Sequence, residues 1–237
     1  MNLFSIPSLF LIVSSTPNLT ATQNTKKPYP PFEYQPKYEG PCPNLKGTNK
    51  WDIDTYSSHN WWQPISTPFF WNFPGSTCIS AYYNATGELS NTGGVYFSVV
   101  NQCILPEQKQ EISGNEYGLA TGLGVENTSK NGTASVIFYQ GDGIPDSEGD
   151  NYTILDTDNV SYSYVWTPTH DDDSCRPILY ILVNDRNLSK KQVAGHVESA
   201  MAIIRETGWK WADKFEETLE YWPTVNCPDV PDSPFKN

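Results

Sequence analysis

Short segments in which apolar and polar residues alternate fill the middle of the chain. Eight of them are rich in β-branched and aromatic residues and are bounded by Gly, Pro, Asn or Asp, as strands are. They cover residues 61–66, 77–84, 95–102, 117–125, 134–139, 152–156, 162–167 and 178–183. The turn at residues 91–94, Asn-Thr-Gly-Gly, favours a hairpin between the second and third segments. The pattern predicts an all-β fold.

One helical pattern follows the strands, over residues 189–206. Ser189 and Gln192 form a capping-box pattern at its start, and Gly208 is a typical stop. Its apolar positions recur at helical spacing and are Val193, Val197, Ala200, Met201 and Ile204. The last strand segment, 178–183, is apolar on both faces, so one face needs a cover. These features together predict an eight-stranded antiparallel up-and-down barrel with one C-terminal α-helix packed outside. Residues 209–222 are ambiguous.

Composition narrows the class of protein. The 237 residues suit one domain, and an aromatic content of 14% is enough to bury a core, which argues against disorder. A net charge of −12 argues against nucleic acid and anionic membrane surfaces as partners, because both are bound mainly through Lys and Arg. No segment is long and apolar enough for a transmembrane helix, so we do not expect an integral membrane protein.

The N-terminal residues indicate export. An apolar run at residues 9–13 followed by small residues predicts a signal peptide over 1–21. A Pro/Tyr-rich arm then covers 22–40, the folded domain 41–228 and a short tail 229–237. Sequons that predict glycosylation lie at Asn18, Asn84, Asn127, Asn131, Asn151, Asn159 and Asn187. We therefore expect a secreted, extracellular glycoprotein.

Five cysteines, Cys42, Cys78, Cys103, Cys175 and Cys227, are an odd number. In an oxidising compartment two disulfides and one remaining thiol are expected. No Cys-x-x-Cys pair occurs, which argues against a zinc ribbon or a redox dithiol.

Several motifs resemble those of the lipocalins, in particular the branch of apolipoprotein D and crustacyanin. The matching segments, in order, are 40–43 (GPCP), 52–56 (DIDTY) with Trp61 and Trp62, 78–83 (CISAYY), 99–102 (VVNQ), 157–162 (TDNVSY) and 225–228 (VNCP). The resemblance spans residues 40–228 and implies a barrel that binds a small hydrophobic ligand.

The resemblance also implies particular residue roles. Trp61 is expected to plug one end of the barrel, although His59 stands where the family has Gly. Asn184 replaces the Arg that the family stacks over that Trp, and Arg186 is a possible substitute. The implied disulfides are Cys42–Cys175 and Cys78–Cys227, and the alternative pairing Cys103–Cys227 stays open.

Alternation along the strands indicates which side chains face a cavity. The inward candidates are Ala81, Tyr83, Phe97, Val99, Asn101 and Tyr180. By the resemblance, Tyr83 and Asn101 align with positions that contact ligand in relatives, and Tyr180 aligns with an inward aromatic residue on the last strand. This mostly apolar set suits a hydrophobic molecule with one polar end: a bilin, a carotenoid or retinoid, a steroid or a fatty acid. The Tyr and Trp content favours a bound chromophore, a bilin or carotenoid, and no other cofactor is expected.

Three alternatives remain. Cys103 could act as the nucleophile of a lipocalin-type enzyme, although Lys109 is the only nearby base in the sequence. Cys103 could instead pair with another protein, or the chain could form a homo-oligomer. The barrel could also be filled by its own side chains, with an interaction function on the outside. No catalytic motif appears in the sequence. The run His170–Asp173 contains possible metal ligands, but an acidic run of this kind is more typical of a solvated loop. We expect no enzyme and no metal.

Overall fold

The computed structural model describes residues 35–68, 76–104, 118–138, 148–171 and 173–227, all within one compact unit, Pro31–Asn237. The predicted signal peptide, most of the predicted arm and the tail 229–237 lie outside the described residues.

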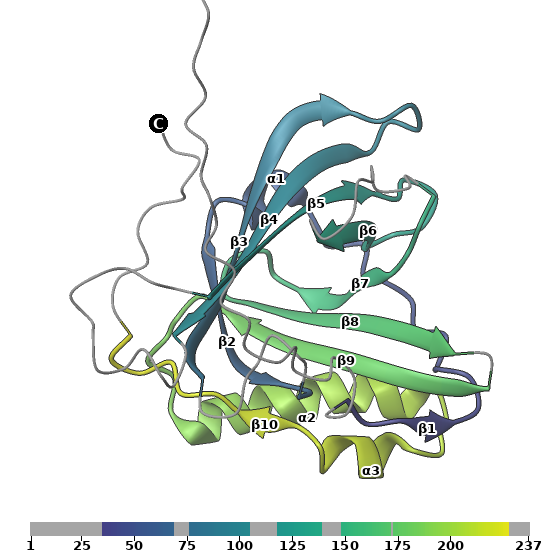
Figure 1. The fold of residues 1–237 in the computed structure, drawn as a ribbon, viewed down its shortest axis with the longest axis vertical. Helices are drawn as coiled ribbons and strands as arrows, with labels where there is room; N and C mark the ends of the chain where they lie inside the picture. Colours follow the sequence, from purple (N-terminus) through teal and green to yellow (C-terminus); the bar gives the residue numbers. More distant parts are fainter. Residues whose placement is uncertain (1–34, 69–75, 105–117, 139–147, 172, 228–237) are drawn as a thin grey trace, which may run out of the picture. The chain divides into compact units, whose positions relative to one another are not determined.

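Eight antiparallel strands form the main sheet (Figure 1). They are β2 (Asn60–Ser66), β3 (Thr77–Leu89), β4 (Val95–Ile104), β5 (Gly118–Glu126), β6 (Thr133–Phe138), β7 (Tyr152–Thr157), β8 (Tyr162–Asp171) and β9 (Ser174–Val183). Each strand pairs with the next in sequence. The last strand, β9, also pairs with the first, β2, with Trp62 opposite Val183 and Ile65 opposite Ile181. The sheet is therefore a closed barrel, and the predicted fold is confirmed.

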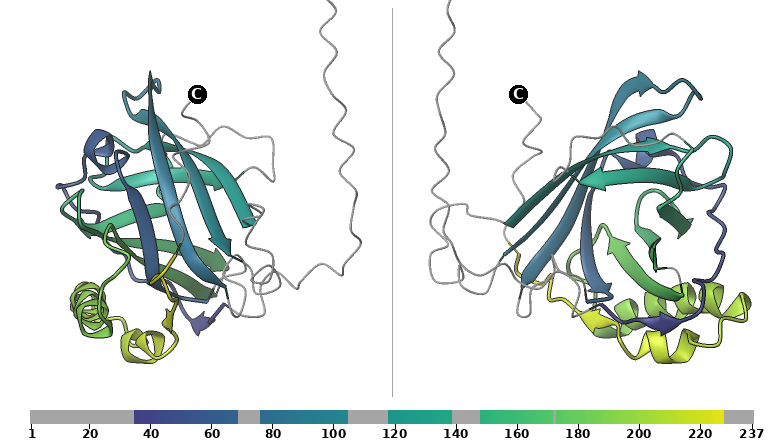
Figure 2. Two further views of the ribbon diagram at one scale, coloured as in Figure 1. Left: turned by 90° about the vertical axis from the view of Figure 1, so that its left-hand side faces the viewer. Right: turned by 45° about the vertical axis from the view of Figure 1, so that its right-hand side comes forward.

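The two faces of β9 explain why a helix covers the barrel. Leu182 points into the core inside the barrel, whereas Leu179, Ile181 and Val183 pack in a second core outside it. Helix α2 (Lys190–Glu206) closes this second core with Val193, Ala200, Met201 and Ile204. Ser189 is its N-cap, and the predicted capping box with Gln192 is present. Figures 1 and 2 show α2 lying along the outer surface of the sheet.

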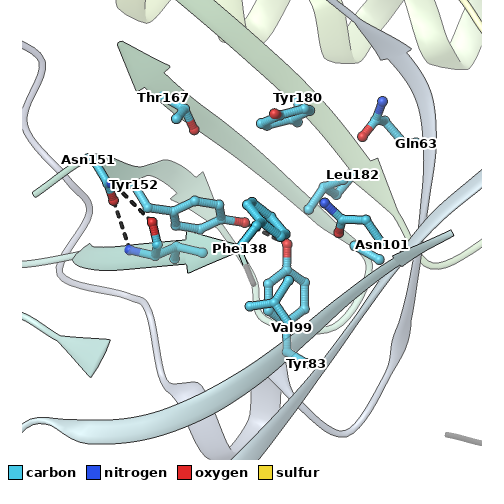
Figure 3. Close-up of a pocket in the computed structure, with 12 residues that line it drawn as sticks. Gln63, Tyr83, Val99, Asn101, Phe138, Asn151, Tyr152, Thr167, Tyr180 and Leu182 are labelled. Carbon is cyan, nitrogen blue, oxygen red and sulfur yellow. Dashed lines mark hydrogen bonds between the residues drawn. The ribbon is translucent and has the colours of Figure 1, made fainter. Parts of the chain in front are cut away.

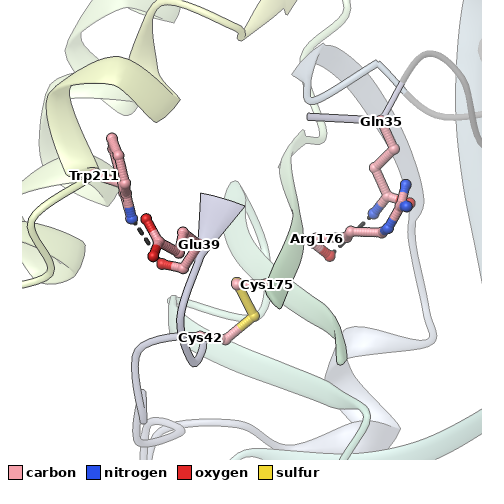
Figure 4. Close-up of a disulfide and its surroundings, with 6 residues drawn as sticks. All are labelled: Gln35, Glu39, Cys42, Cys175, Arg176 and Trp211. Atoms are coloured by element: carbon pink, nitrogen blue, oxygen red, sulfur yellow. Dashed lines mark hydrogen bonds between the residues drawn. A yellow bond between two sulfur atoms is a disulfide. The ribbon is translucent and has the colours of Figure 1, made fainter. Parts of the chain in front are cut away.

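The N-terminal part of the described chain is fixed to the outside of the same strand. Strand β1 (Tyr38–Glu39) pairs with β9, and the disulfide Cys42–Cys175 joins the two segments. The indole of Trp211 donates a hydrogen bond to the carbonyl oxygen of Glu39, 2.9 Å away (Figure 4). Trp211 precedes α3 (Ala212–Glu216), a short helix within the stretch for which the sequence pattern was ambiguous. Sequence analysis did not predict β1 or α3.

The C-terminal segment fills a gap in the barrel wall. Strand β2 pairs with β3 only over Asn60–Trp62, and strand β10 (Glu220–Tyr221) pairs with the rest of β2, at Ile65 and Ser66. The next residues continue these contacts: Trp222 N–H donates to Pro64, and Cys78 N–H donates to Pro223. The disulfide Cys78–Cys227 then attaches the segment to β3. Cys42–Cys175 and Cys78–Cys227 are the two disulfides that the family resemblance implied.

Helix α1 (Ile53–Tyr56) lies at one end of the barrel, beside the turns that join β3 to β4 and β5 to β6. Asp52 caps it by accepting a hydrogen bond from Thr55 N–H at 2.8 Å. Tyr56, completely buried, stacks on Trp61 with 4.6 Å between ring centroids. The Trp61 indole donates to the Tyr56 carbonyl oxygen at 3.0 Å. These aromatic rings close this end of the barrel.

Candidate functional site: a hollow inside the barrel

A hollow lies inside the barrel above this closed end. Its apolar lining consists of Ala81, Val99, Val136, Phe138 and Leu182. The hollow measures about 450 Å³ when its opening to solvent is included. Only about 50 Å³ of this space can hold the centre of a water molecule, which is room for roughly four waters. Drug-sized ligands usually occupy pockets of about 300–1,000 Å³. The described lining therefore leaves a narrow cavity.

Five of the six residues expected to face a ligand line this hollow: Ala81, Tyr83, Val99, Asn101 and Tyr180. Phe97, the sixth, is not part of the lining. It is completely buried, and its ring lies so close to Gly124 that a Cβ atom there would come within 2.3 Å of it. Phe97 also contacts Trp51 edge-on, at 6.1 Å between centroids. It therefore packs in the core instead of lining the cavity.

Tyr83 and Tyr152 meet across the hollow. Their hydroxyl oxygens are 2.6 Å apart and form a hydrogen bond, in which either phenol can be the donor (Figure 3). Burial raises the pKa of both phenols well above the usual value of 10. Both side chains are therefore neutral at physiological pH. Sequence analysis missed Tyr152, although its position on a predicted strand with inward neighbours could have indicated it.

A second group of polar side chains has spare hydrogen-bonding capacity. Burial alone raises the pKa of Tyr180, and its hydroxyl makes no hydrogen bond within the described part of the chain. The Thr167 hydroxyl is buried without a partner there. The Gln63 amide nitrogen donates to Ser66 Oγ at 3.0 Å, and its carbonyl oxygen accepts no hydrogen bond from the described residues. Asn151, by contrast, is satisfied, because its amide exchanges two hydrogen bonds with the backbone of Val136.

These three polar groups come from neighbouring strands of the wall, because Thr167 lies on β8, Tyr180 on β9 and Gln63 on β2. Asn101 also lines the hollow, from β4, which β3 separates from β2. In Figure 3 Thr167, Tyr180 and Gln63 follow one side of the hollow, with the Tyr83–Tyr152 pair on the other. None of the described lining residues is an Asp, Glu, His, Lys or Arg. The site is apolar and uncharged, with a few hydrogen-bonding groups.

The predicted aromatic plug is present, but the cation beside it contacts a different ring. Trp61 is completely buried. The Arg186 guanidinium lies over Trp62, 5.6 Å from the ring centroid, and not over Trp61. Trp62 follows Trp61 on β2, so its side chain leaves the opposite face of the strand and reaches the outer core that Arg186 borders. Arg186, the possible substitute for the family's Arg, therefore contacts the second Trp of the pair and not the plug.

Cys103 belongs to neither disulfide. It is buried beside Ile79 and Trp222, next to the C-terminal segment. Burial raises the pKa of the Cys103 thiol, and the nearby Ser76 hydroxyl opposes this only in part. The thiol is therefore protonated at neutral pH, which makes it a poor nucleophile. The described residues contain no cluster of His, Cys, Asp and Glu that could hold a metal ion.

A larger and more open groove lies on the outside, at the closed end. It has a volume of about 580 Å³ and is lined by polar residues such as His59, Asn60, Asn184, Asp185 and Arg186. This groove is more than ten times the free space inside the barrel, and it faces solvent. It therefore resembles a surface depression more than a ligand cavity.

The sequons differ in how their side chains are used. Asn131, Asn151 and Asn187 are exposed. Asn127 is 4% exposed, and its amide nitrogen donates to the carbonyl oxygens of Glu148 and Gly149. The amides of Asn151 and Asn159 are also donors, to Val136 and Lys50. Asn84 is half-buried on β3. Asn18 lies outside the described residues.

Neither a protein-family model nor a curated protein sequence matches the chain. Solved structures do match it. Insecticyanin from the tobacco hornworm Manduca sexta is 17% identical, with a TM-score of 0.55 over 79% of this chain and 88% of that chain. Apocrustacyanin C1 is 14% identical, with a TM-score of 0.56 over 82% and 93% of the two chains. Lobster apocrustacyanin A1 is 14% identical, with a TM-score of 0.53 over 78% and 89%.

Identities this low establish the fold alone. The closed eight-stranded barrel, the helix packed outside it and these neighbours agree. Among the residues that the structure describes, no helix is long and apolar enough to cross a membrane. The chain has the lipocalin fold.

Proposed function

We propose that this protein binds a small hydrophobic ligand inside the barrel and transports or sequesters it. The observation that carries the proposal is the lining: a hollow that opens to solvent, is mostly apolar and has no charged side chain among the described residues, with the Thr167 hydroxyl buried there without a described partner. Buried polar groups are normally paired with protein or water. A hollow of this kind is typical of a site where water is exchanged for a ligand. The structural likeness to insecticyanin and the apocrustacyanins is consistent with this function.

The size of the hollow favours a compact ligand. Free space of about 50 Å³ is less than a bilin, a carotenoid or retinoid, a steroid or a fatty acid requires. A ligand of any of these classes fits only if lining side chains such as Phe138 rotate away. A bound chromophore therefore demands more rearrangement than a small ligand with one ring or a short chain.

Secretion and glycosylation form part of the same proposal. Two disulfides that join residues 133 and 149 positions apart suit an oxidising compartment. Asn131 and Asn187 are the sequons that we expect to carry glycans, because their side chains are exposed and that of Asn151, although exposed, is held by the Val136 backbone. Asn127 is the one that we expect to be unmodified in the folded protein, since a glycan would disrupt its two buried hydrogen bonds.

Titration of the protein with small hydrophobic compounds tests the proposal. Binding should quench tryptophan fluorescence, because Trp51 and Trp61 lie in or beside the barrel core. Ala81 lines the hollow and Ala194 is exposed on α2. Replacement Ala81→Trp should fill the hollow and abolish binding, whereas the matched control Ala194→Trp should bind as the wild type does. Equal binding by both variants would show that the ligand site lies elsewhere.

An interaction function on the outside is the second candidate, and the narrowness of the hollow favours it. A barrel filled by its own side chains would bind no ligand while keeping its fold, and the polar groove near Arg186 would then be the larger site. A wild-type protein that binds no compound in the titration, yet unfolds cooperatively, would support this candidate. If the protein were an enzyme that uses Cys103, the variant Cys103→Ala would lose activity. If it carries a ligand, Cys103→Ala should still bind that ligand.

A further inference from the structure

The described residues that line the hollow include no charged side chain, and this restricts the ligands that the hollow can accept. Every polar lining residue in the described chain is a phenol, a hydroxyl or an amide. An ionised carboxylate that enters such a site loses its hydration and finds no cation in exchange. The net charge of −12 on the whole chain adds unfavourable long-range electrostatics for an anion.

The same lining offers hydrogen bonds to a neutral polar group. The Tyr180 hydroxyl and the Asn101 amide can donate, and the Gln63 carbonyl oxygen can accept. Thr167 Oγ1, buried without a partner among the described residues, can do either. A hydroxyl or carbonyl oxygen on the ligand would satisfy one or two of these groups, which a hydrocarbon leaves unpaired.

The opposite side of the hollow does not compete for that group. Tyr83 and Tyr152 already use their hydroxyls in a hydrogen bond to each other at 2.6 Å, and the Asn151 amide oxygen and nitrogen each bond to the Val136 backbone. The polar end of a ligand is therefore directed to the side formed by β8, β9 and β2, where Thr167, Tyr180 and Gln63 lie (Figure 3).

We infer that the barrel selects uncharged hydrophobic molecules that carry a hydroxyl or carbonyl group, bound at Tyr180, and rejects the carboxylic acids of the same skeleton. This inference rests on the proposed function and deepens it by naming the ligand class. It separates the classes that the fold alone leaves open, since alcohols, ketones and esters fall on one side and ionised fatty acids on the other.

Matched ligand series test the inference on the full-length protein at neutral pH. Each series consists of an alcohol, the carboxylic acid, its methyl ester and the parent hydrocarbon: one built on hexanol, one on decanol and one on retinol. The dissociation constants come from tryptophan quenching and calorimetry. We expect the alcohol and the ester to bind at least tenfold tighter than the acid, because only the acid is charged.

Removing one hydroxyl locates the polar contact. Tyr180→Phe should weaken binding of the alcohol about fivefold and leave binding of the hydrocarbon unchanged, since one neutral hydrogen bond is lost. Tyr162→Phe is the matched control, because the Tyr162 hydroxyl donates to Asp156, which does not line the hollow. Circular dichroism and thermal unfolding establish that both variants fold. Asn101→Lys should shift preference towards the acid by placing a cation in the lining.

The outcomes separate this inference from the proposed function. If acids bind as tightly as the alcohols, or Tyr180→Phe weakens the alcohol no more than Tyr162→Phe does, the selectivity is wrong while carriage stands. If no member of any series binds the folded wild type, the proposed function fails and the inference fails with it. Tenfold discrimination that depends on Tyr180 supports both.

Discussion

Asp158 shows how a single side chain can fix a turn at the closed end of the barrel. Its carboxylate accepts hydrogen bonds from the backbone N–H groups of Val160, Ser161 and Tyr162, and from the Ser161 hydroxyl. Burial alone would raise the pKa of Asp158, but these bonds outweigh it and lower the pKa to about 2. The turn joins β7 to β8, within the segment that resembles the lipocalin motif.

This pKa predicts an acid-sensitive contribution to stability. Because the folded pKa of about 2 lies below the usual value of 3.8, the folded state favours the ionised carboxylate. The stabilisation is complete above about pH 4 and is lost as the pH falls towards 2. We expect Asp158→Asn to be less stable than the wild type at pH 7 and nearly equal to it at pH 2, as measured by urea unfolding. A constant difference across this range would contradict the assignment, and exposed Asp54→Asn is the control.

At the scale of elements, the strands were predictable from the sequence, because apolar and polar residues alternate along a strand with one buried face and turn residues mark its ends. Strand β3 extends to Leu89, five residues past its predicted end, since β3 and β4 continue as a paired hairpin beyond the barrel. Strands β1 and β10 are two residues long, too short to show any period, and they exist because β9 and β2 offer them an edge. Their formation depends on tertiary contacts that no local pattern contains.

The candidate site was predictable in part for the same reason. The alternation of side chains along each strand predicted that Tyr83, Asn101 and Tyr180 lie on the inner face, and all three line the hollow. The alternation does not show how far along the barrel axis a residue lies. Phe97 was therefore expected to line the cavity, but it packs on Gly124. Nor does the alternation show that Tyr83 and Tyr152 pair, because these residues are 69 positions apart.

The C-terminal segment is the element whose attachment is easiest to test. Cys78–Cys227 closes a loop of 149 residues, and loop-closure entropy alone predicts about 5 kcal/mol of stabilisation. We expect the double variant Cys78→Ala/Cys227→Ala to lose roughly this free energy of unfolding in urea. Limited proteolysis should then cleave near Tyr221, since β10 is held otherwise by few hydrogen bonds. Unchanged stability and resistance to protease would show that backbone pairing and Trp222 packing suffice.

At the scale of the whole molecule, ligand binding adds to the free energy of unfolding, because the ligand binds the folded barrel and not the unfolded chain. A ligand that binds only the closed barrel stabilises it by about 2.7 kcal/mol at a hundred times its dissociation constant. For a domain of this size each kcal/mol corresponds to roughly 2–4 °C, so the melting temperature should rise by roughly 5–10 °C. The rise should be absent in Ala81→Trp and present in Cys103→Ala, because the first fills the hollow and the second alters a side chain that does not line it. Scanning calorimetry measures both. A ligand that binds without raising the melting temperature would have to bind the unfolded chain equally well, which is incompatible with a site assembled from β2, β4, β8 and β9.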